Sequence, residues 1–216
     1  MKIAVFGTGM VGNAIATKLV KLGHEVMMGS RAPGNAKGAE WVKANGPKAT
    51  QGTFAEAAAF GDVVVLAVSG QVALEAVKLA GPRALNGKTV IDACNPIGGG
   101  PPVNGVLSYF TTLTDSLMER LQKAYPEAHF VKAFNSVGNA QMVNPQFAGG
   151  RPTMFICGND AGAKKTVTQI LDEFGWDTED MGAVEAARAI EPLCMLWCIP
   201  GVGKGDWSPH AFKLLR

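Results

Sequence analysis

The sequence has 216 residues, of which 47% are hydrophobic, and its formal net charge at pH 7 is +2. This length and composition predict a compact domain with a sizeable core, and the small charge argues against a nucleic-acid or membrane-surface partner. No apolar run is long enough for a membrane span, and the N-terminus lacks a signal-peptide pattern, so we expect a cytoplasmic protein with no membrane partner.

The first informative feature in chain order is a glycine motif between a predicted strand at residues 2–6 and a predicted helix. In a GxGxxG pattern the three glycines permit a tight turn, a close approach of pyrophosphate to the backbone, and close packing of helix on strand. The phosphates then lie at the helix N-terminus. This context favours a dinucleotide site over an ordinary strand-turn-helix. The predicted cofactor-binding residues are Gly7, Thr8, Gly9, Met10, Val11 and Gly12.

The end of the second predicted strand, at residues 24–28, indicates which dinucleotide binds. An NAD-specific site carries Asp or Glu about 20 residues beyond the glycines, to accept a hydrogen bond from the ribose 2′-hydroxyl. Here Ser30 and Arg31 stand at that place, and a hydroxyl and a guanidinium suit a 2′-phosphate. We therefore predict NADP as the cofactor. The alternative is that Ser30 caps a turn and Arg31 is a solvated charge.

The rest of the chain alternates predicted helices with apolar strands. This alternation predicts an α/β fold of the Rossmann type, a doubly wound, mostly parallel sheet with a small α/β C-terminal extension ending in a helix kinked at Pro192. Thr53 and Glu56 have the spacing of a capping box. We expect an NADP-binding domain at 1–138 and a smaller part at 139–216 packed on it. Expected helices are 37–45, 53–60, 71–79, 113–124, 159–174 and 183–199, and expected strands are 62–68, 88–92, 129–134, 151–158 and 176–180.

Small or amide-bearing residues follow three of these predicted strands. Ligands of a parallel sheet collect at the carboxyl ends of its strands, so these residues are expected to contact ribose, carboxamide or a ring, although each set could simply form a turn. The Gly-Pro loop at 98–102 is either a lid or a surface loop. The residues singled out are Val68 and Ser69, then Asn95 and Pro96, then Asn135, Ser136 and Val137.

The cysteines and histidines form no metal or redox pattern. The four cysteines, at 94, 157, 194 and 198, contain no CxxC pair, and the three histidines are scattered. Cys194 and Cys198 share one face of a predicted helix, which more often reflects burial than redox chemistry. We therefore expect neither a metal site nor a disulfide.

Five segments together resemble the coenzyme F420-dependent NADP oxidoreductases, and also the reductase domain of the six-transmembrane metalloreductases. They are GTGMVG at 7–12, GSR at 29–31, DACNP at 92–96, VKAFNSVG at 131–138 and ARAIEPL at 187–193. The resemblance implies that Thr8, Ser30 and Arg31 contact the 2′-phosphoadenosine part of NADP. It also implies that the turn at 95–96 and the loop at 135–138 flank the nicotinamide and the acceptor ring. Family members often carry a further basic residue after the SerArg pair, for which Lys37 is the nearest candidate.

The predicted function is hydride transfer between NADPH and a flat-ring acceptor, in the first place the deazaflavin coenzyme F420. Such catalysis consists of positioning, with Asn135, Ser136 and Val137 expected to orient the acceptor, because the cofactors supply the chemistry. The alternatives are an NADPH-dependent flavin, ferric or small-carbonyl reductase, and a non-catalytic NADPH-binding sensor. We expect the chain to form a homodimer. We also expect it to bind a small-molecule redox acceptor. Basic groups for the anionic tail of F420 would come from Arg151, Lys164, Lys165, Arg188 and Lys204, which are scattered in sequence.

Overall fold

The computed structural model describes residues 1–216 and contains a six-stranded sheet with the strand order β3-β2-β1-β4-β5-β6. Every neighbouring pair of strands is parallel. This is the order of a doubly wound dinucleotide-binding sheet, so the predicted fold class is confirmed. The strands are β1 (Lys2–Phe6), β2 (Glu25–Ser30), β3 (Ala49–Thr53), β4 (Val63–Leu66), β5 (Thr89–Asp92) and β6 (His129–Lys132).

Seven α-helices and three short 3-10 segments connect and cover the strands. None of the helices combines the length and the apolar character that a bilayer crossing requires. The α-helices are α1 (Met10–Lys21), α2 (Ala36–Asn45), α3 (Phe54–Phe60), α4 (Ala73–Ala80), α5 (Leu117–Ala124), α6 (Ala161–Phe174) and α7 (Ala187–Lys204). The 3-10 segments are η1 (Gly70–Val72), η2 (Asn139–Gln141) and η3 (Val184–Ala186).

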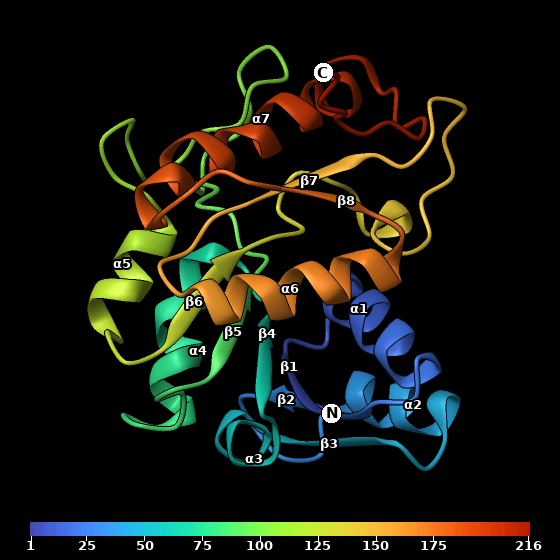
Figure 1. The fold of residues 1–216 in the computed structure, drawn as a ribbon, viewed down its shortest axis with the longest axis vertical. Helices are drawn as coiled ribbons and strands as arrows, with labels where there is room; N and C mark the ends of the chain where they lie inside the picture. The colour runs from blue at the N-terminus through green and yellow to red at the C-terminus, as the bar shows by residue number, and fades with distance from the viewer.

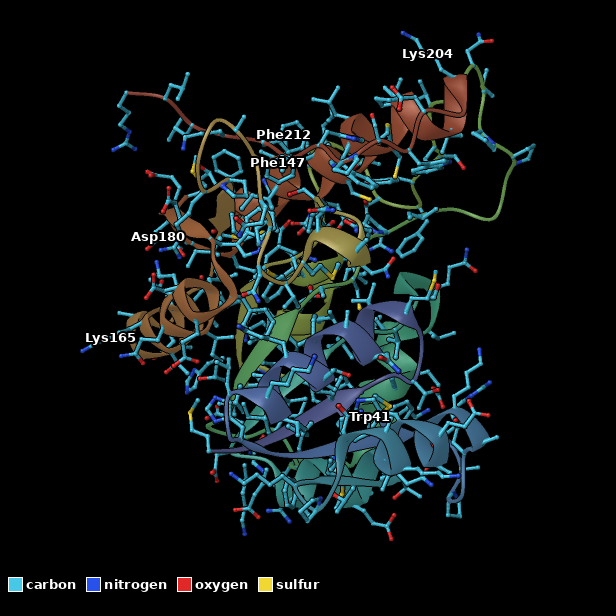
Figure 2. The ribbon with its side chains drawn as sticks, turned by 90° about the vertical axis from the view of Figure 1, so that its right-hand side faces the viewer. Trp41, Phe147, Lys165, Asp180, Lys204 and Phe212 are labelled. Atoms are coloured by element: carbon cyan, nitrogen blue, oxygen red, sulfur yellow. The ribbon has the colours of Figure 1, made fainter.

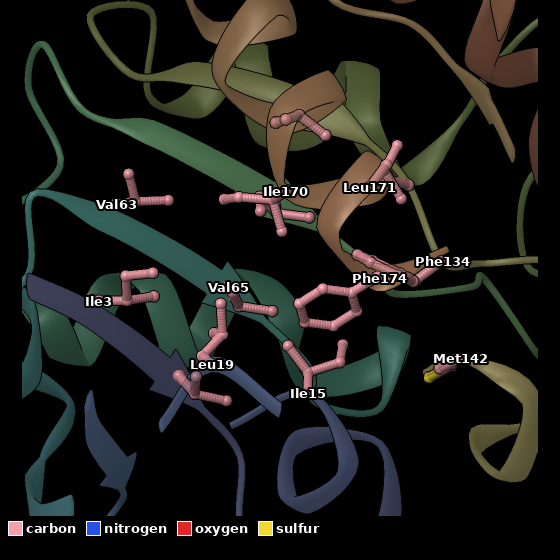
Figure 3. Close-up of a cluster of buried hydrophobic side chains, with 14 of the residues drawn as sticks. Ile3, Ile15, Leu19, Val63, Val65, Phe134, Met142, Ile170, Leu171 and Phe174 are labelled. Carbon is pink, nitrogen blue, oxygen red and sulfur yellow. The ribbon is translucent and has the colours of Figure 1, made fainter. Parts of the chain in front are cut away.

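Alternation along the buried strands divides the core between the two faces of the sheet. Ile3 and Val5 of β1 belong to a cluster with side chains of α1, α2 and α6, whereas Ala4 and Phe6 belong to a second cluster with α3, α4 and α5. Figure 3 shows residues of α1 and α6 converging on the strands in the first cluster. Because both faces are covered, the central strand β4 is apolar throughout rather than alternately polar.

The C-terminal part adds a two-stranded parallel sheet of β7 (Thr153–Ile156) and β8 (Asp177–Asp180), which lies above α6 in Figure 1. An antiparallel bridge between Lys132 and Cys157 links the end of β6 to the segment after β7. Met154 and Ile156 are buried in the same cluster as Ile3, so this part shares a core with the large sheet. The division of the chain into domains at residue 138 stays a prediction.

Capping residues and apolar patterns in the sequence predicted most helices and strands close to their observed positions. The capping box at the start of α3 is confirmed, because Thr53 Oγ1 accepts from the Glu56 N–H at 3.2 Å and Glu56 Oε2 accepts from the Thr53 N–H at 2.7 Å. The helix expected from residue 113 begins at 117 instead, because the Ser116 side chain caps it by accepting from the Glu119 N–H at 3.1 Å.

Three other expectations differ from the structure. The edge strand β3 was not predicted, because its sequence ATQGT has neither an apolar run nor a strong alternation and gains its hydrogen bonds from β2. The final helix α7 extends to Lys204 and contains both Pro192 and Pro200. The segment expected as one helix at 71–79 is divided into η1 and α4.

Phe174 is a direct test of the core that joins the two parts of the chain. Its ring is fully buried and lies 5.5 Å from that of Phe134, between centroids. We expect Phe174→Ala to lower the free energy of unfolding by about 3–5 kcal/mol, because the substitution leaves a cavity. Denaturant titration measures this change. Leu215→Ala, at a side chain that is 79% exposed, is the control and should change stability by less than about 0.5 kcal/mol.

Candidate functional site

A cavity of about 500 Å³ lies at the carboxyl ends of β1, β2 and β4. In this strand order the chain winds in opposite directions from β1 and β4, so their following loops diverge and leave a crevice between them. The cavity walls come from the loop after β1, the end of β2, α3, the loop after β4, and α4. The lining residues are Gly7, Thr8, Gly9, Ser30, Arg31, Ala32, Asn35, Phe54, Ala67, Val68, Ser69, Val72, Glu75, Ala76 and Leu79.

The glycine loop is shaped by two close backbone contacts. Gly7 has φ of 122°, and a Cβ there would lie 2.3 Å from the carbonyl oxygen of Ala67. A Cβ on Gly12 would lie 2.1 Å from the carbonyl oxygen of Gly7. Gly9 caps α1 without any side-chain hydrogen bond, so the first N–H groups of the helix have no side-chain acceptor at the N-cap. Such free donors at the positive end of a helix suit a phosphate group.

Ser30 and Arg31 both line the cavity but differ in what they offer. The Ser30 hydroxyl is buried and donates to the carbonyl oxygen of Ala32 at 2.6 Å. Arg31 is exposed and forms no ion pair with any carboxylate of the chain. Its guanidinium is therefore available to an anionic ligand, with geometry suited to phosphate.

A smaller cavity of about 220 Å³ continues the site past the glycine loop. It shares Gly9, Ala67, Val68 and Ser69 with the first cavity. It adds Val11, Ala93 and a highly exposed Met10 side chain, and none of its side chains is charged. A nearly neutral surface of this kind suits a flat ring.

Lys37 lies outside both cavities. It lines a polar groove of about 800 Å³ between α1 and α2, together with Lys21 and Glu40. Thr8 and Gly9 are the only residues that line both this groove and the first cavity. The structure therefore brings Arg31, but not Lys37, to the wall of the first cavity.

The residues expected at the acceptor ring do not line these cavities. Asn135, Ser136 and Val137 are 2%, 5% and 7% exposed, and none lines a described cavity. Asn135 Nδ2 donates to the carbonyl oxygen of Ile190 at 2.9 Å, while Asn95 Nδ2 donates to the carbonyl oxygen of Asn135 at 2.8 Å. The roles predicted for these residues, and for Asn95 and Pro96, stay predictions.

Beneath the strand ends lies a buried cluster of charges that the sequence reasoning missed. Lys132 Nζ is 2.7 Å from Asp92 Oδ2 and 2.8 Å from Glu191 Oε1, and none of the three side chains is more than 2% exposed. Glu191 also accepts from the N–H groups of Leu117 and Met118, at 3.0 Å each, at the start of α5. The sequence did contain a signal for this cluster, because the two buried strands β5 and β6 each end in a charged residue, Asp92 and Lys132.

The charge states of the buried groups follow from their surroundings. Burial by itself lowers the pKa of Lys132, but the adjacent carboxylates of Asp92 and Glu191 outweigh that effect and raise the pKa overall. Burial raises the pKa of the Cys94 thiol, and the Asp92 charge adds to this effect. At neutral pH the cluster therefore holds an ammonium group beside a neutral thiol, which donates to the carbonyl oxygen of Val68 at 3.2 Å.

A second wall of the first cavity, separate from the glycine loop, was also not predicted from the sequence. Phe54, Val72, Ala76 and Leu79 form this apolar wall, and Glu75 stands among them. They come from the start of α3 and from the segment around α4, whose amphipathic pattern predicts burial but not a cavity. Only the packing of α4 beside α3 places them at the site.

Comparison with known proteins gives three findings. Residues 2–96 match the family described as NADP oxidoreductase, coenzyme F420-dependent. A crystal structure from Arthrobacter sp. FB24, provisionally assigned as an F420-dependent NADP reductase, is 36% identical, with a TM-score of 0.91 and full coverage of both chains. Metalloreductase STEAP3 of Rattus norvegicus is 31% identical over 205 residues, which are 92% of this chain but 38% of the metalloreductase.

More distant structures share the fold. A reductive aminase from Aspergillus terreus, in complex with NADPH and ethyl-5-oxohexanoate, is 20% identical with a TM-score of 0.67. The match covers 94% of this chain and 62% of the aminase. At this identity the likeness concerns the arrangement of the sheet and its helices.

Arg31 provides a test of the anion-binding end of the site. We expect Arg31→Ala to weaken NADPH binding by about tenfold to a hundredfold, because a hydrogen bond to a charged group contributes about 1.5–3 kcal/mol. Affinity for NADH, which lacks the 2′-phosphate, should stay nearly unchanged. Titration calorimetry with both nucleotides measures the ratio. Lys37→Ala is the matched control and should have the smaller effect; an unaltered preference in Arg31→Ala would contradict this assignment.

Proposed function

Because this chain belongs to the coenzyme F420-dependent NADP oxidoreductase family, we propose that it transfers a hydride between NADPH and a flat-ring acceptor, with coenzyme F420 as the first candidate. The observation that carries the proposal is the continuity of the two cavities. A site with an unpaired guanidinium at one end leads along a glycine loop to an uncharged recess at the other. The guanidinium would fit the 2′-phosphate of NADPH, the glycine loop its pyrophosphate, and the uncharged recess its nicotinamide.

The residues of this chain would act by binding and orientation. Arg31 would hold the 2′-phosphate, and the free N–H groups at the start of α1 would hold the pyrophosphate. When NADPH is bound, its reduced nicotinamide would supply the hydride. Met10, Val68 and Ala93 would pack on its ring, exclude water and leave one side open to the acceptor. Catalysis of this kind depends on bringing two rings within about 3–3.5 Å, and it requires no general base.

A second candidate acceptor is a flavin or a ferric chelate, which lacks the polyglutamate tail of F420. This candidate is favoured because most of the basic residues expected to bind that tail already form ion pairs within the chain. Arg151, Lys164 and Arg188 each pair with carboxylates of the chain, namely Asp172 and Asp177, Asp180, and Glu119. Lys165 and Lys204 have no such partner but lie in different parts of the molecule (Figure 2). The two unpaired lysines therefore do not form one binding site for the tail.

The proposal is tested by NADPH oxidation at 340 nm with F420, FMN, FAD and a ferric chelate supplied in parallel. Rapid turnover with F420 alone is expected from the first candidate, and turnover with flavin or iron from the second. Arg31→Ala should slow whichever reaction occurs by raising KM for NADPH, because the residue binds a part of the cofactor that does not react. Tight NADPH binding without oxidation by any acceptor would contradict the enzymatic proposal.

A further inference from the structure

We propose that Lys132 is a positioning residue for the nicotinamide end of the site, acting through the backbone of residues 92–95. The inference rests on the proposed function, because it concerns the end of the cavity where the nicotinamide would bind. Lys132 itself is fully buried and touches neither cavity.

Three oxygen atoms lie around the Lys132 ammonium group. Nζ forms ion pairs with Asp92 Oδ2 at 2.7 Å and Glu191 Oε1 at 2.8 Å, and it donates to the carbonyl oxygen of Cys94 at 3.0 Å. The position of the group is therefore constrained by contacts with three different residues. The Cys94 carbonyl is consequently turned away from the cavity and held towards the buried side.

Contacts of Cys94 and its neighbours lead from this carbonyl to the cavity surface. The Cys94 N–H donates to Asp92 Oδ1 at 2.9 Å, and its thiol donates to the carbonyl oxygen of Val68 at 3.2 Å. Val68 lines both cavities, and Ala93 lines the smaller one. The Asn95 carbonyl packs against Gly70, just after Ser69. The floor of the smaller cavity is thus hydrogen-bonded to the buried charge cluster.

The loop at 135–138, which is also predicted to flank the ring, is hydrogen-bonded to residues next to the cluster. Asn135 Nδ2 donates to Asn95 Oδ1 at 3.3 Å and to the carbonyl oxygen of Ile190, the residue before Glu191. Lys132 therefore joins the ends of β5 and β6 to the beginning of α7. Its removal should loosen both loops together.

The adenosine end of the site is built independently of this cluster. Ser30, Arg31, Phe54 and Val72 form that end, and none of them has a hydrogen bond or ion pair with Lys132, Asp92 or Glu191. The ligand 2′,5′-ADP would occupy only the adenosine end, whereas NADPH would occupy both. The two ligands can therefore separate a local positioning effect from general destabilisation.

The test measures the dissociation constants of NADPH and 2′,5′-ADP for Lys132→Met by titration calorimetry. We expect Kd for NADPH to rise about tenfold and Kd for 2′,5′-ADP to change by less than about twofold, since displaced groups weaken contacts only where they are displaced. The fluorescence anisotropy of the reduced nicotinamide at saturation should also fall. Equal weakening of both ligands, or no change in either, would overturn the proposal.

Two further variants keep the result interpretable if Lys132→Met is poorly folded. Lys132→Met combined with Glu191→Gln leaves one buried carboxylate and the same net charge as the original cluster, and it should reproduce the selective loss. Arg188→Met removes the ion pair that Arg188 of α7 forms with Glu119 of α5, and it should leave both affinities unchanged. If the unmodified protein bound NADPH no more tightly than 2′,5′-ADP, the proposed function would fail before Lys132 was tested.

Discussion

The buried ion cluster of Lys132, Asp92 and Glu191 is the interaction on which the arrangement of the site depends. Isolated charges cannot remain in a protein interior, because losing water costs several kcal/mol per ion after relaxation. Here each charge is compensated, by the opposite charge or by backbone N–H groups at the start of α5. Removing one partner from such a cluster typically costs about 3–5 kcal/mol, so β5, β6, α5 and α7 are held in one relative geometry.

The crevice in which this cluster operates comes from topology. The sheet reverses its winding between β1 and β4, so a cavity opens there whatever side chains line it. The missing side chain of Gly7 then lets the loop after β1 approach Ala67, and that of Gly12 lets α1 approach Gly7. The first constraint creates the site, the glycines shape its phosphate end, and the ion cluster supports its other end.

Charge distribution separates the two ends of the site. The guanidinium of Arg31 is unpaired and exposed, whereas the basic groups of the C-terminal part are largely neutralised by neighbouring carboxylates. A paired cation adds little to the attraction of an anionic ligand, because its field is cancelled nearby and screened by salt. Under the proposed function, the nucleotide would be selected by charge and the acceptor mainly by shape.

The sequence by itself determined the fold class, the glycine loop, the position of Arg31 after β2 and the capping box at Thr53. These features depend on short-range spacing and local backbone chemistry. It did not determine the edge strand β3, which is stabilised by pairing with β2 rather than by its own pattern. Nor could it show that Lys37 faces a different groove, or that Asp92, Lys132 and Glu191 meet. The pairing of β5 with β6 places Asp92 beside Lys132, 40 positions along the chain. Glu191 is 59 positions beyond Lys132, and only the tertiary packing of α7 brings it within 2.8 Å of the ammonium group.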